Sequence, residues 1–301
     1  MTNFADRLSA AILDKGSAVC VGIDPRLAQL PSEFKPKRDT PREAAEAVGR
    51  WAVALVEVVA PLVPVVKPQL AFFEAFGSPG FRAYHDTVIA ARERGLLVIA
   101  DAKRGDIGST AEAYAEAHFD VIGADAMTVN PYLGRDSLDP YTPYMKAGKG
   151  LFVLVKTSNP GSSDLQDLWA GDAPMHHHVA RMVHSLGRDV VGACKQSAVG
   201  AVVGATHPSE LVRLRQILPD APLLVPGYGA QGGTADDCAA AFLPDGTGAV
   251  VNSSRGITFA FRSGEHAKRY GDAGWRDSVR AAVVEMRDAL EAARKRKSGA
   301  K

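Results

Sequence analysis

The sequence is poor in cysteine, in long apolar runs and in net charge, and each shortage excludes a class of protein. Its three cysteines in 301 residues are scattered and form no Cys-x-x-Cys pair, so neither a disulfide scaffold nor a cysteine-ligated zinc site is expected. No apolar stretch approaches the roughly 20 residues that span a bilayer. The formal net charge of +1 gives no global field to attract nucleic acid or a membrane surface. A cytoplasmic protein without membrane or nucleic-acid partners is expected.

Two local enrichments stand out from this composition. The basic run at 294–297 could bind nucleic acid, but basic residues also favour a helix C-terminus, and a flexible basic tail is expected over 294–301. The consecutive histidines His176–His178 suggest a metal. Successive helical residues point about 100° apart, so these rings are not expected to converge on one ion, and no metal is expected.

Short apolar runs recur along the chain, each followed by polar residues or glycine and then by a helical pattern. There are eight of them, at 18–23, 63–66, 96–100, 126–129, 151–155, 200–203, 222–225 and 248–251. Near-continuous apolar strands are typical of a parallel sheet buried on both faces. Eight βα units in this length predict an α/β fold, a single (β/α)8 TIM-barrel domain over 1–301. A doubly wound open sheet is the alternative, and it lacks the expected Gly-x-Gly-x-x-Gly after the first run.

The segments between and after these runs predict helices and one insert. Helical patterns lie at 42–59, 81–94, 209–217 and, closing the chain, at 277–293. The connection after the fifth run is longer than the others and rich in Gly, Ser, Asp and Pro. It predicts a mobile loop insert over 159–178, with a lid as one possible use.

The polar residues that follow the apolar runs are the candidate site. In such barrels the chemistry lies at the C-terminal ends of the strands. The residues found there are Asp24, Lys67, Asp101, Lys103, Asn130, Lys156, Thr157, Ser158, Gly204, Thr206, Gly227, Ser253 and Arg255. Each one alone is explained by a helix cap or a turn, but so many charged groups on one rim indicate a functional site.

The most informative motif is Asp101-Ala-Lys103-Arg-Gly-Asp106, at the end of the third run. Residues two apart on a strand point the same way, so Asp101 and Lys103 should share a face. Lys67 ends the second run, and Pro68 fixes the chain there. We therefore interpret Lys67 as a partner of Asp101 rather than as a surface lysine whose stem covers apolar atoms. Isolated charges are costly to bury, so these groups must be paired or used in catalysis.

A second motif predicts a phosphate site. The glycine-rich loop 226–233, which contains Gly229 and Gln231, follows the seventh run, and Arg255 follows the eighth. Glycines let backbone amides approach an anion, and arginine offers a bidentate fork. Loops after strands seven and eight hold phosphate in many such barrels. Tight turns also need glycine, but the combination with Arg255 favours phosphate binding.

With both motifs in place, the chain resembles the orotidine 5′-phosphate decarboxylase family in its longer bacterial form. The matching segments are VGIDPR at 21–26, VKPQLAFFE at 66–74, ADAKRGDIGST at 100–110, VNPYLG at 129–134, KTSNPGS at 156–162, PGYGAQGG at 226–233 and NSSRG at 252–256. The resemblance implies a carboxy-lyase that converts orotidine 5′-phosphate to UMP in pyrimidine biosynthesis. It also implies a homodimer with shared active sites that needs no metal and no organic cofactor.

The resemblance assigns a role to each candidate residue. The charged catalytic network would comprise Lys67, Asp101, Lys103 and Asp106. Within it, Lys103 would protonate C6, and Asp106 would reach across the dimer interface, where Thr110 would join it. The other contacts to substrate would come from Asp24 to the ribose, Ser158 to the pyrimidine, and Gln231, Arg255 and the loop backbone around Gly229 to the phosphate.

Three other functions stay open from the sequence. A Schiff-base aldolase would use Lys67 or Lys156 as its nucleophile and would need a lysine with a lowered pKa, whereas the carboxylates beside Lys103 favour an ammonium. A magnesium-dependent sugar-phosphate synthase or decarboxylase could carry the same Asp-x-Lys-x-x-Asp motif. A phosphate-ligand sensor without catalysis is disfavoured by the intact charges on the rim.

Overall fold

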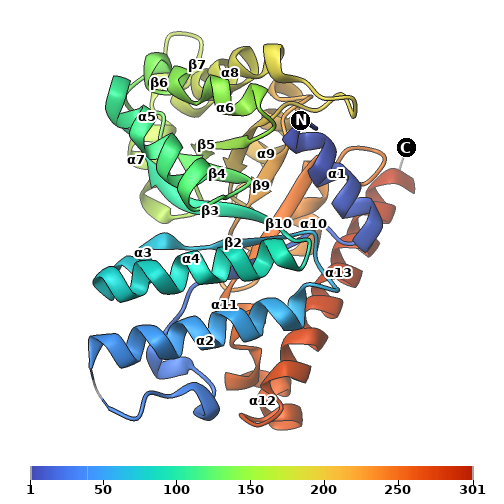
Figure 1. The fold of residues 1–301 in the computed structure, drawn as a ribbon. Coiled ribbons are helices and arrows are strands. Elements are labelled where there is room, and N and C mark those ends of the chain that lie inside the picture. The colour runs from blue at the N-terminus through green and yellow to red at the C-terminus, as the bar shows by residue number, and fades with distance from the viewer. Residues whose placement is uncertain (1, 39, 300–301) are drawn as a thin grey trace.

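The centre of the molecule is a closed barrel of eight parallel strands, seen in Figure 1 in a computed structural model that describes residues 2–38 and 40–299. Around the barrel the strands follow the order β1-β10-β9-β8-β5-β4-β3-β2. Their bounds are β1 Val19–Ile23, β2 Val65–Pro68, β3 Leu97–Arg104, β4 Ala126–Val129, β5 Gly150–Lys156, β8 Val199–Val203, β9 Leu223–Val225 and β10 Ala249–Ser253. All eight apolar runs form these strands, so the predicted TIM barrel is confirmed.

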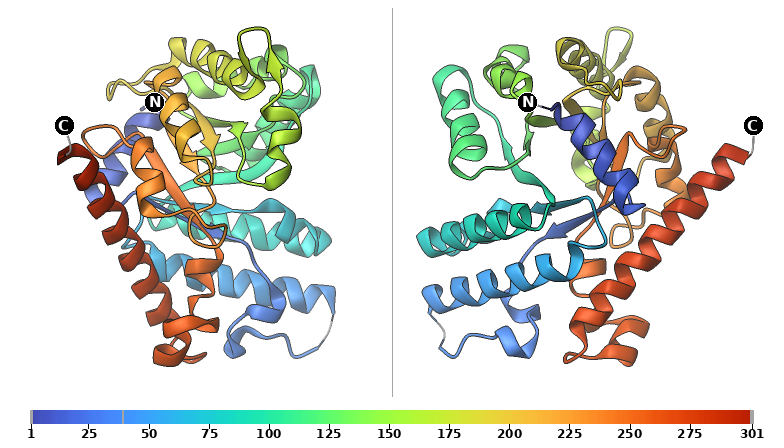
Figure 2. Two further views of the ribbon diagram at one scale, coloured as in Figure 1. Left: turned by 180° about the vertical axis from the view of Figure 1, so that it is seen from behind. Right: turned by 45° about the vertical axis from the view of Figure 1, so that its right-hand side comes forward.

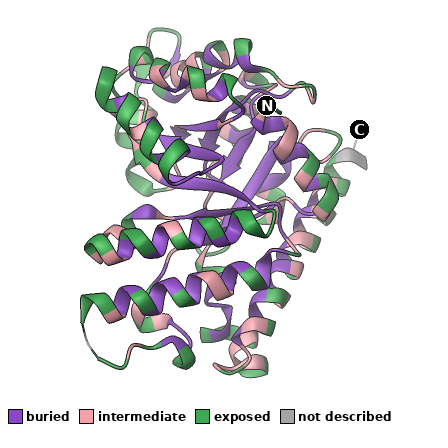
Figure 3. Cartoon of the chain, in the orientation of Figure 1, coloured by how far each residue is buried: buried purple, intermediate pink, exposed green. Residues whose placement is uncertain are grey.

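Burial on both faces explains why the strands read as continuous apolar runs. Every residue of β1, β2, β4, β8, β9 and β10 is buried, and the barrel is almost entirely purple in Figure 3. One face of each strand fills the barrel interior, and the other packs against the helices. At the end of β3 the pattern changes to partly exposed residues, which brings charged groups to the rim.

Helices cover the outside of the barrel, as the two views of Figure 2 show. Their bounds are α1 Phe4–Lys15, α2 Pro41–Val59, α3 Leu70–Glu74, α4 Gly77–Glu93, α5 Gly108–Glu116, α6 Thr142–Lys146, α7 Ser163–Gln166, α8 Met175–Gly187, α9 Pro208–Ile217, α10 Ala235–Cys238, α11 Arg255–Thr258, α12 Gly264–Tyr270 and α13 Trp275–Gly299. Among the described residues, no helix combines the length and apolar character that crossing a membrane requires.

Helix α1 packs over the N-terminal ends of β4 and β5. Phe4 meets Phe152 edge-on with ring centroids 5.9 Å apart, and a Cβ on Gly150 would lie 2.4 Å from the Phe4 ring. Arg7 donates to Asp125 Oδ1 at 2.5 Å, just before β4. Because these contacts cover the N-terminal ends of the two strands, the opposite rim is the one left for binding and catalysis.

The insert after β5 is more regular than predicted. It contains a 3-10 turn at Pro160–Ser162, helix α7, and an antiparallel hairpin of β6 Trp169–Ala170 with β7 Ala173–Pro174. The end of the predicted segment, 175–178, already belongs to α8. A loop over the whole of 159–178 was therefore the wrong expectation, because polar residues in the insert bond to the end of β5 and fix its turns.

The basic tail also differs from its prediction. Helix α13 begins at Trp275 and continues to Gly299, beyond the expected end at 293. Arg296 pairs with Asp236 at 2.6 Å, so basic residues of the predicted tail act as helix residues that contact the neighbouring α10. Residues 300–301 of that tail lie outside the described part of the chain.

Candidate active site

A row of three charged residues lies at the C-terminal rim of the barrel, on neighbouring strands. Lys67 is the penultimate residue of β2, and Asp101 and Lys103 lie near the end of β3. Lys67 Nζ donates to Asp101 Oδ2, and Lys103 Nζ donates to Asp101 Oδ1 at 2.5 Å. The predicted pairing of Lys67 with Asp101 is confirmed, and Lys103 shares a face with Asp101 as expected. We call Lys67, Asp101 and Lys103 the charged row.

The charged row runs from the buried interior toward solvent. Lys67 and Asp101 are 5% and 4% exposed, whereas the Lys103 side chain is 44% exposed. Burial alone would lower the pKa of Lys67, but the charges of Asp101 and Asp24 raise it above its ordinary value. Burial would raise the pKa of Asp101, but the charges of Lys67 and Lys103 hold it at about 2. The buried pair is therefore ionised at neutral pH.

The backbone at Lys103 adopts a conformation that side chains rarely take. Its φ is +48°, and the pairing of β3 with β4 shifts register between Ala100 and Arg104. Lys103 N donates to Thr128 Oγ1 at 3.0 Å, and Thr128 in turn donates to Asp101 Oδ1 at 3.1 Å. Left-handed backbone at a non-glycine residue costs on the order of 1–3 kcal/mol and is concentrated at functional sites. Here it holds the ammonium against Asp101 at the open end of the barrel.

Asp24, at the end of β1, has an unsatisfied acceptor. Its Oδ1 is buried and has no hydrogen-bond partner within the described residues. An unpaired buried acceptor is costly unless a ligand supplies a donor. Asp24 is also close enough to Lys67 to raise that lysine's pKa. The side chain can therefore accept a hydrogen bond from a hydroxyl bound beside the charged row.

Ser158 and Gln231 are close together on the rim, beside the glycine loop. A Cβ on Gly227 would lie 3.1 Å from Gln231 Oε1 and 3.2 Å from the Ser158 Cβ. A Cβ on Gly204 would lie 2.8 Å from the Ser158 Cα. Gly227 and Gly204 must therefore lack side chains for Ser158 and Gln231 to approach.

The turn that bears Gln231 depends on left-handed glycines. Gly227, Gly229 and Gly232 have φ of +98°, +69° and +94°, left-handed values that favour glycine. A Cβ at Gly229 would meet nothing within 4 Å, so the space beside its backbone is open. The loop keeps its shape through backbone bonds such as Gly229 N to Gly233 O at 2.8 Å. An anion can approach this backbone closely.

Arg255 begins α11, directly after β10, and its side chain is exposed. In the part of the chain that the structure describes, its guanidinium has no ion-pair partner. β10 pairs with β9 through Val251 and Val225, so Arg255 and the glycine loop follow adjacent strands. A free guanidinium beside a glycine loop can bind a phosphate.

Two predicted residues do not join the charged row within one chain. Asp106 Oδ1 accepts a hydrogen bond from Ile107 N at 2.9 Å, on the turn after β3. Thr110 is exposed on α5. Large apolar side chains near them are exposed as well: Ile107 at 56% and, after β4, Tyr132 at 80% and Leu133 at 49%.

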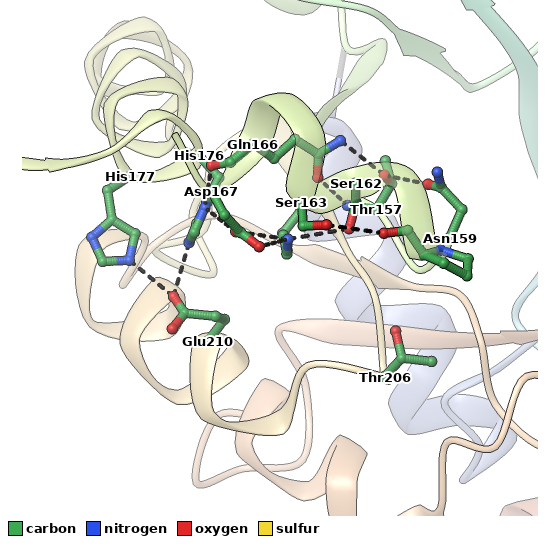
Figure 4. A network of polar contacts seen from close by, with 12 residues as sticks. Thr157, Asn159, Ser162, Ser163, Gln166, Asp167, His176, His177, Thr206 and Glu210 are labelled. Atoms are coloured by element: carbon green, nitrogen blue, oxygen red, sulfur yellow. Dashed lines mark hydrogen bonds and ion pairs between the residues drawn. The ribbon is translucent and has the colours of Figure 1, made fainter. Parts of the chain in front are cut away.

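A polar network between β5 and its insert was missed from the sequence (Figure 4). Lys156 is 1% exposed, and its Nζ donates to both carboxylate oxygens of Asp167 at 2.7 and 2.8 Å and to Ser162 Oγ at 3.1 Å. Thr157 N donates to Gln166 Oε1 at 2.9 Å. The Lys156 ammonium therefore holds the insert rather than facing the charged row. The acidic and amide side chains of the insert were the only feature of the sequence that could have indicated this network.

The expectation that the histidines point apart does not hold for two of the three rings. His176 Nε2 and His177 Nε2 lie 2.8 and 3.1 Å from the same atom, Glu210 Oε2 on α9, as Figure 4 shows. Side chains that leave a helix about 100° apart can still meet at a third group lying between their directions. Imidazole rings are long enough for this, and α9 places a carboxylate there.

The comparisons with known proteins agree with this geometry. The model of the orotidine 5′-phosphate decarboxylase / HUMPS family matches residues 17–270. The chain belongs to that family. The orotidine 5′-phosphate decarboxylase of Rhodopirellula baltica is 47% identical over 304 residues, covering 97% of this chain and 100% of its own. That of Clostridium perfringens is 41% identical over 289 residues, covering 93% and 99%.

Solved structures of the family share the whole architecture. A putative orotidine-monophosphate decarboxylase from Toxoplasma gondii superposes with a TM-score of 0.84 at 34% identity, covering 99% of both chains. A putative orotidine 5′-phosphate decarboxylase from Streptomyces avermitilis does so with a TM-score of 0.79 at 34% identity, covering 98% of this chain and 97% of its own. The family resemblance in the sequence motifs is thus confirmed.

Proposed function

We propose that this protein decarboxylates orotidine 5′-phosphate to UMP and CO2 in pyrimidine biosynthesis, without a metal or an organic cofactor. The observation that carries the proposal is the charged row, in which a strained, partly exposed Lys103 contacts a buried, ionised Asp101. Family membership and the names of its relatives support the same reaction.

The charged row suits a reaction that leaves a carbanion. When the bond between C6 and the carboxylate breaks, its electron pair stays on C6 as CO2 leaves. The Lys103 ammonium stabilises that charge and then donates a proton to C6, and solvent restores its proton. Asp101 repels the substrate carboxylate but not the product ring. The site therefore favours the transition state over the bound substrate.

The remaining rim residues each bind a different part of the substrate. Asp24, with its unpaired Oδ1, accepts from the ribose hydroxyls. Ser158 contacts the pyrimidine edge, next to Gln231. Gln231, Arg255 and the backbone around Gly229 bind the phosphate. Binding energy from the remote phosphate then helps to exclude water around the ring.

The proposal includes a cytoplasmic homodimer in which each subunit lends Asp106 and Thr110 to the other's site. Its support is that neither residue contacts the charged row in a single chain, as their described contacts indicate. The exposed Ile107, Tyr132 and Leu133 on the same rim would be covered by a second subunit, as apolar side chains at interfaces are.

The Schiff-base alternative fits less well. Lys67 donates to Asp101 and Lys156 donates to Asp167, so a carboxylate holds each candidate amine and neither is free to attack a carbonyl. The deciding experiment follows the absorbance of orotidine 5′-phosphate in the presence of EDTA. Turnover that EDTA leaves unchanged supports the proposal. Loss of turnover that only Mg²⁺ restores, or borohydride trapping of a sugar phosphate, would replace it with one of the alternatives.

A further inference from the structure

A second cluster of chemically capable side chains lies outside the charged row, where α8 and α9 begin. It consists of His176, His177 and Glu210, whose candidate ligand atoms all lie within 4.8 Å of one another. The side chains of His176, His177 and Glu210 are 3%, 14% and 20% exposed. The cluster is thus partly buried, with one side open to solvent. We call it the histidine cluster.

The hydrogen bonds of His176 leave the lone pair of one ring nitrogen facing a carboxylate oxygen. His176 Nδ1 lies 2.7 Å from the carbonyl oxygen of Gln166, which can only accept, so Nδ1 carries a hydrogen. In the neutral ring, Nε2 then presents a lone pair to Glu210 Oε2 at 2.8 Å. Two acceptors at this distance need a proton or a metal cation between them.

The groups around the histidine cluster leave its ligand atoms free to face one another and open to solvent. Glu210 Oε1 is 3.5 Å from Arg213, which leaves Oε2 to face both histidines. An Nδ1–H bonded to a backbone carbonyl is the arrangement that orients metal-binding histidines in proteins. A surface cavity of about 350 Å³ adjoins the cluster and is lined also by Asp172 and Arg181, so an ion has a path of entry.

We propose that His176 Nε2, His177 Nε2 and the Glu210 carboxylate bind one divalent transition-metal ion, for which Zn²⁺ is the best match. Two imidazoles and a carboxylate form a three-ligand zinc set that leaves a fourth position for water. Imidazole ligands favour transition metals over Mg²⁺ or Ca²⁺. The carboxylate also offsets the positive N-terminal ends of α8 and α9, which would otherwise repel a cation.

The proposed ion would connect parts of the fold outside the charged row. His176 belongs to α8 and Glu210 to α9, so one ion would join the starts of these helices. His176 Nδ1 is also 3.3 Å from Asp167 Oδ1, and Asp167 holds Lys156 at the end of β5. A bound metal would therefore brace the insert that follows Ser158, and it would take no part in bond breaking.

The test measures metal binding directly on tag-free, EDTA-treated and desalted protein. Co²⁺ is titrated and followed by its visible absorption, and Zn²⁺ affinity is measured by competition with a chromophoric chelator. One equivalent should bind, and excess Mg²⁺ should not displace it. His177→Gln and Glu210→Gln should each weaken Zn²⁺ binding at least about tenfold, since loss of an outer partner alone costs that much.

His178→Gln is the matched control, because His178 lies next in the chain but bonds the Ala170 carbonyl at 2.6 Å instead. It should keep wild-type affinity. X-ray absorption of the zinc-loaded wild type should report two imidazole ligands, which decides the case even where a variant fails to fold. Absence of one-to-one binding, or equal loss in His178→Gln, would overturn the site. Neither result bears on decarboxylation, which is assayed separately.

Discussion

Lys103 combines an unusual backbone with a position at the barrel mouth. Its φ of +48° and its contact with Asp101 hold one ammonium where C6 of the substrate would lie. We expect Lys103→Ala to lower kcat at least about 10²-fold, the size of a positioned general acid's contribution, while UMP binding stays measurable. Single-turnover kinetics and UMP titration check this. A variant that retains a tenth of wild-type kcat would exclude Lys103 as the proton donor.

We expect Arg255 to contribute to substrate binding rather than to bond breaking. Removing one desolvated bidentate partner of a phosphate costs about 2–5 kcal/mol, so Arg255→Ala should raise KM strongly, and added guanidinium should partly restore activity. Affinity for the phosphate-free nucleoside is the control and should not change. If nucleotide affinity also stays the same and guanidinium rescues nothing, the phosphate binds elsewhere.

The ionisation of Asp101 makes the free energy of unfolding depend on pH, and the two lysines beside it set the sign of that dependence. Its folded-state pKa of about 2 lies below the ordinary value of 3.8, so the unfolded chain binds its proton first. The resulting stability is complete above the unfolded pKa and is lost as pH falls toward 2, an effect on the order of 2 kcal/mol.

Urea unfolding between pH 5 and pH 2 measures this dependence. Wild type should lose more stability over that range than Asp101→Asn, which lacks the group. The Asn variant should also be less stable at neutral pH, because it leaves the buried Lys67 without its counter-charge. Equal slopes in the two proteins would show that folding does not lower the pKa of Asp101.

Contacts between individual residues could be predicted from the sequence where the residues are close in the chain or where the two-residue repeat of a strand sets their direction. Asp101 and Lys103 are two apart, and Lys67 lies near the end of the neighbouring strand, so their meeting could be foreseen. The left-handed Lys103 could not, because the register shift depends on Thr128 from β4. Thr128 is a polar residue within an apolar run, and this was the only indication in the sequence that it contacts the site.

At the scale of elements, the strands were predictable because burial on both faces demands apolar residues at every position. The insert after β5 was not, because its order comes from contacts distant in the chain rather than from its composition. Lys156 with Asp167, and His176 with Glu210, connect segments 11 and 34 residues apart. Composition rich in Gly, Ser and Pro hides such contacts.

The insert offers an element-scale prediction. Asp167→Asn removes the carboxylate that holds the buried Lys156 ammonium, so the insert should loosen and its cleavage by a nonspecific protease should speed up several-fold. Asp164→Asn is the matched control, since Asp164 is exposed on the short helix α7, which ends just before Asp167. Thermal melting reports whether the barrel itself is affected. Equal cleavage rates in the two variants would mean that Lys156 does not fix the insert.

At the scale of the whole molecule, the proposed homodimer would bring Asp106 and Thr110 to a site that they do not contact within one chain. By two-fold symmetry, a dimer that shares sites gives each subunit's Asp106 to the other. Lys103→Ala and Asp106→Ala should each be inactive. After subunit exchange, a mixed dimer has one site with both lesions and one with neither, so about half the sites of that species should recover.

Exchange is verified independently by mass-tagged subunits. If exchange occurs and no activity returns, or if a dilute monomer is active, the sites are not shared. Shared sites stay a prediction that rests on the family resemblance, because the position of Asp106 three residues after Lys103 permits sharing without requiring it. The exposed Ile107 and Tyr132 become visible as a surface only in the folded barrel.

The most direct test of the proposed reaction is proton NMR of the product formed from orotidine 5′-phosphate in D2O with EDTA present. The Lys103 ammonium exchanges its protons with solvent, so each UMP formed should carry deuterium at C6, with its C5 proton seen as a singlet. That result would establish metal-independent decarboxylation with a solvent-exchangeable donor. Absence of UMP, or UMP that carries ordinary hydrogen at C6, would contradict it.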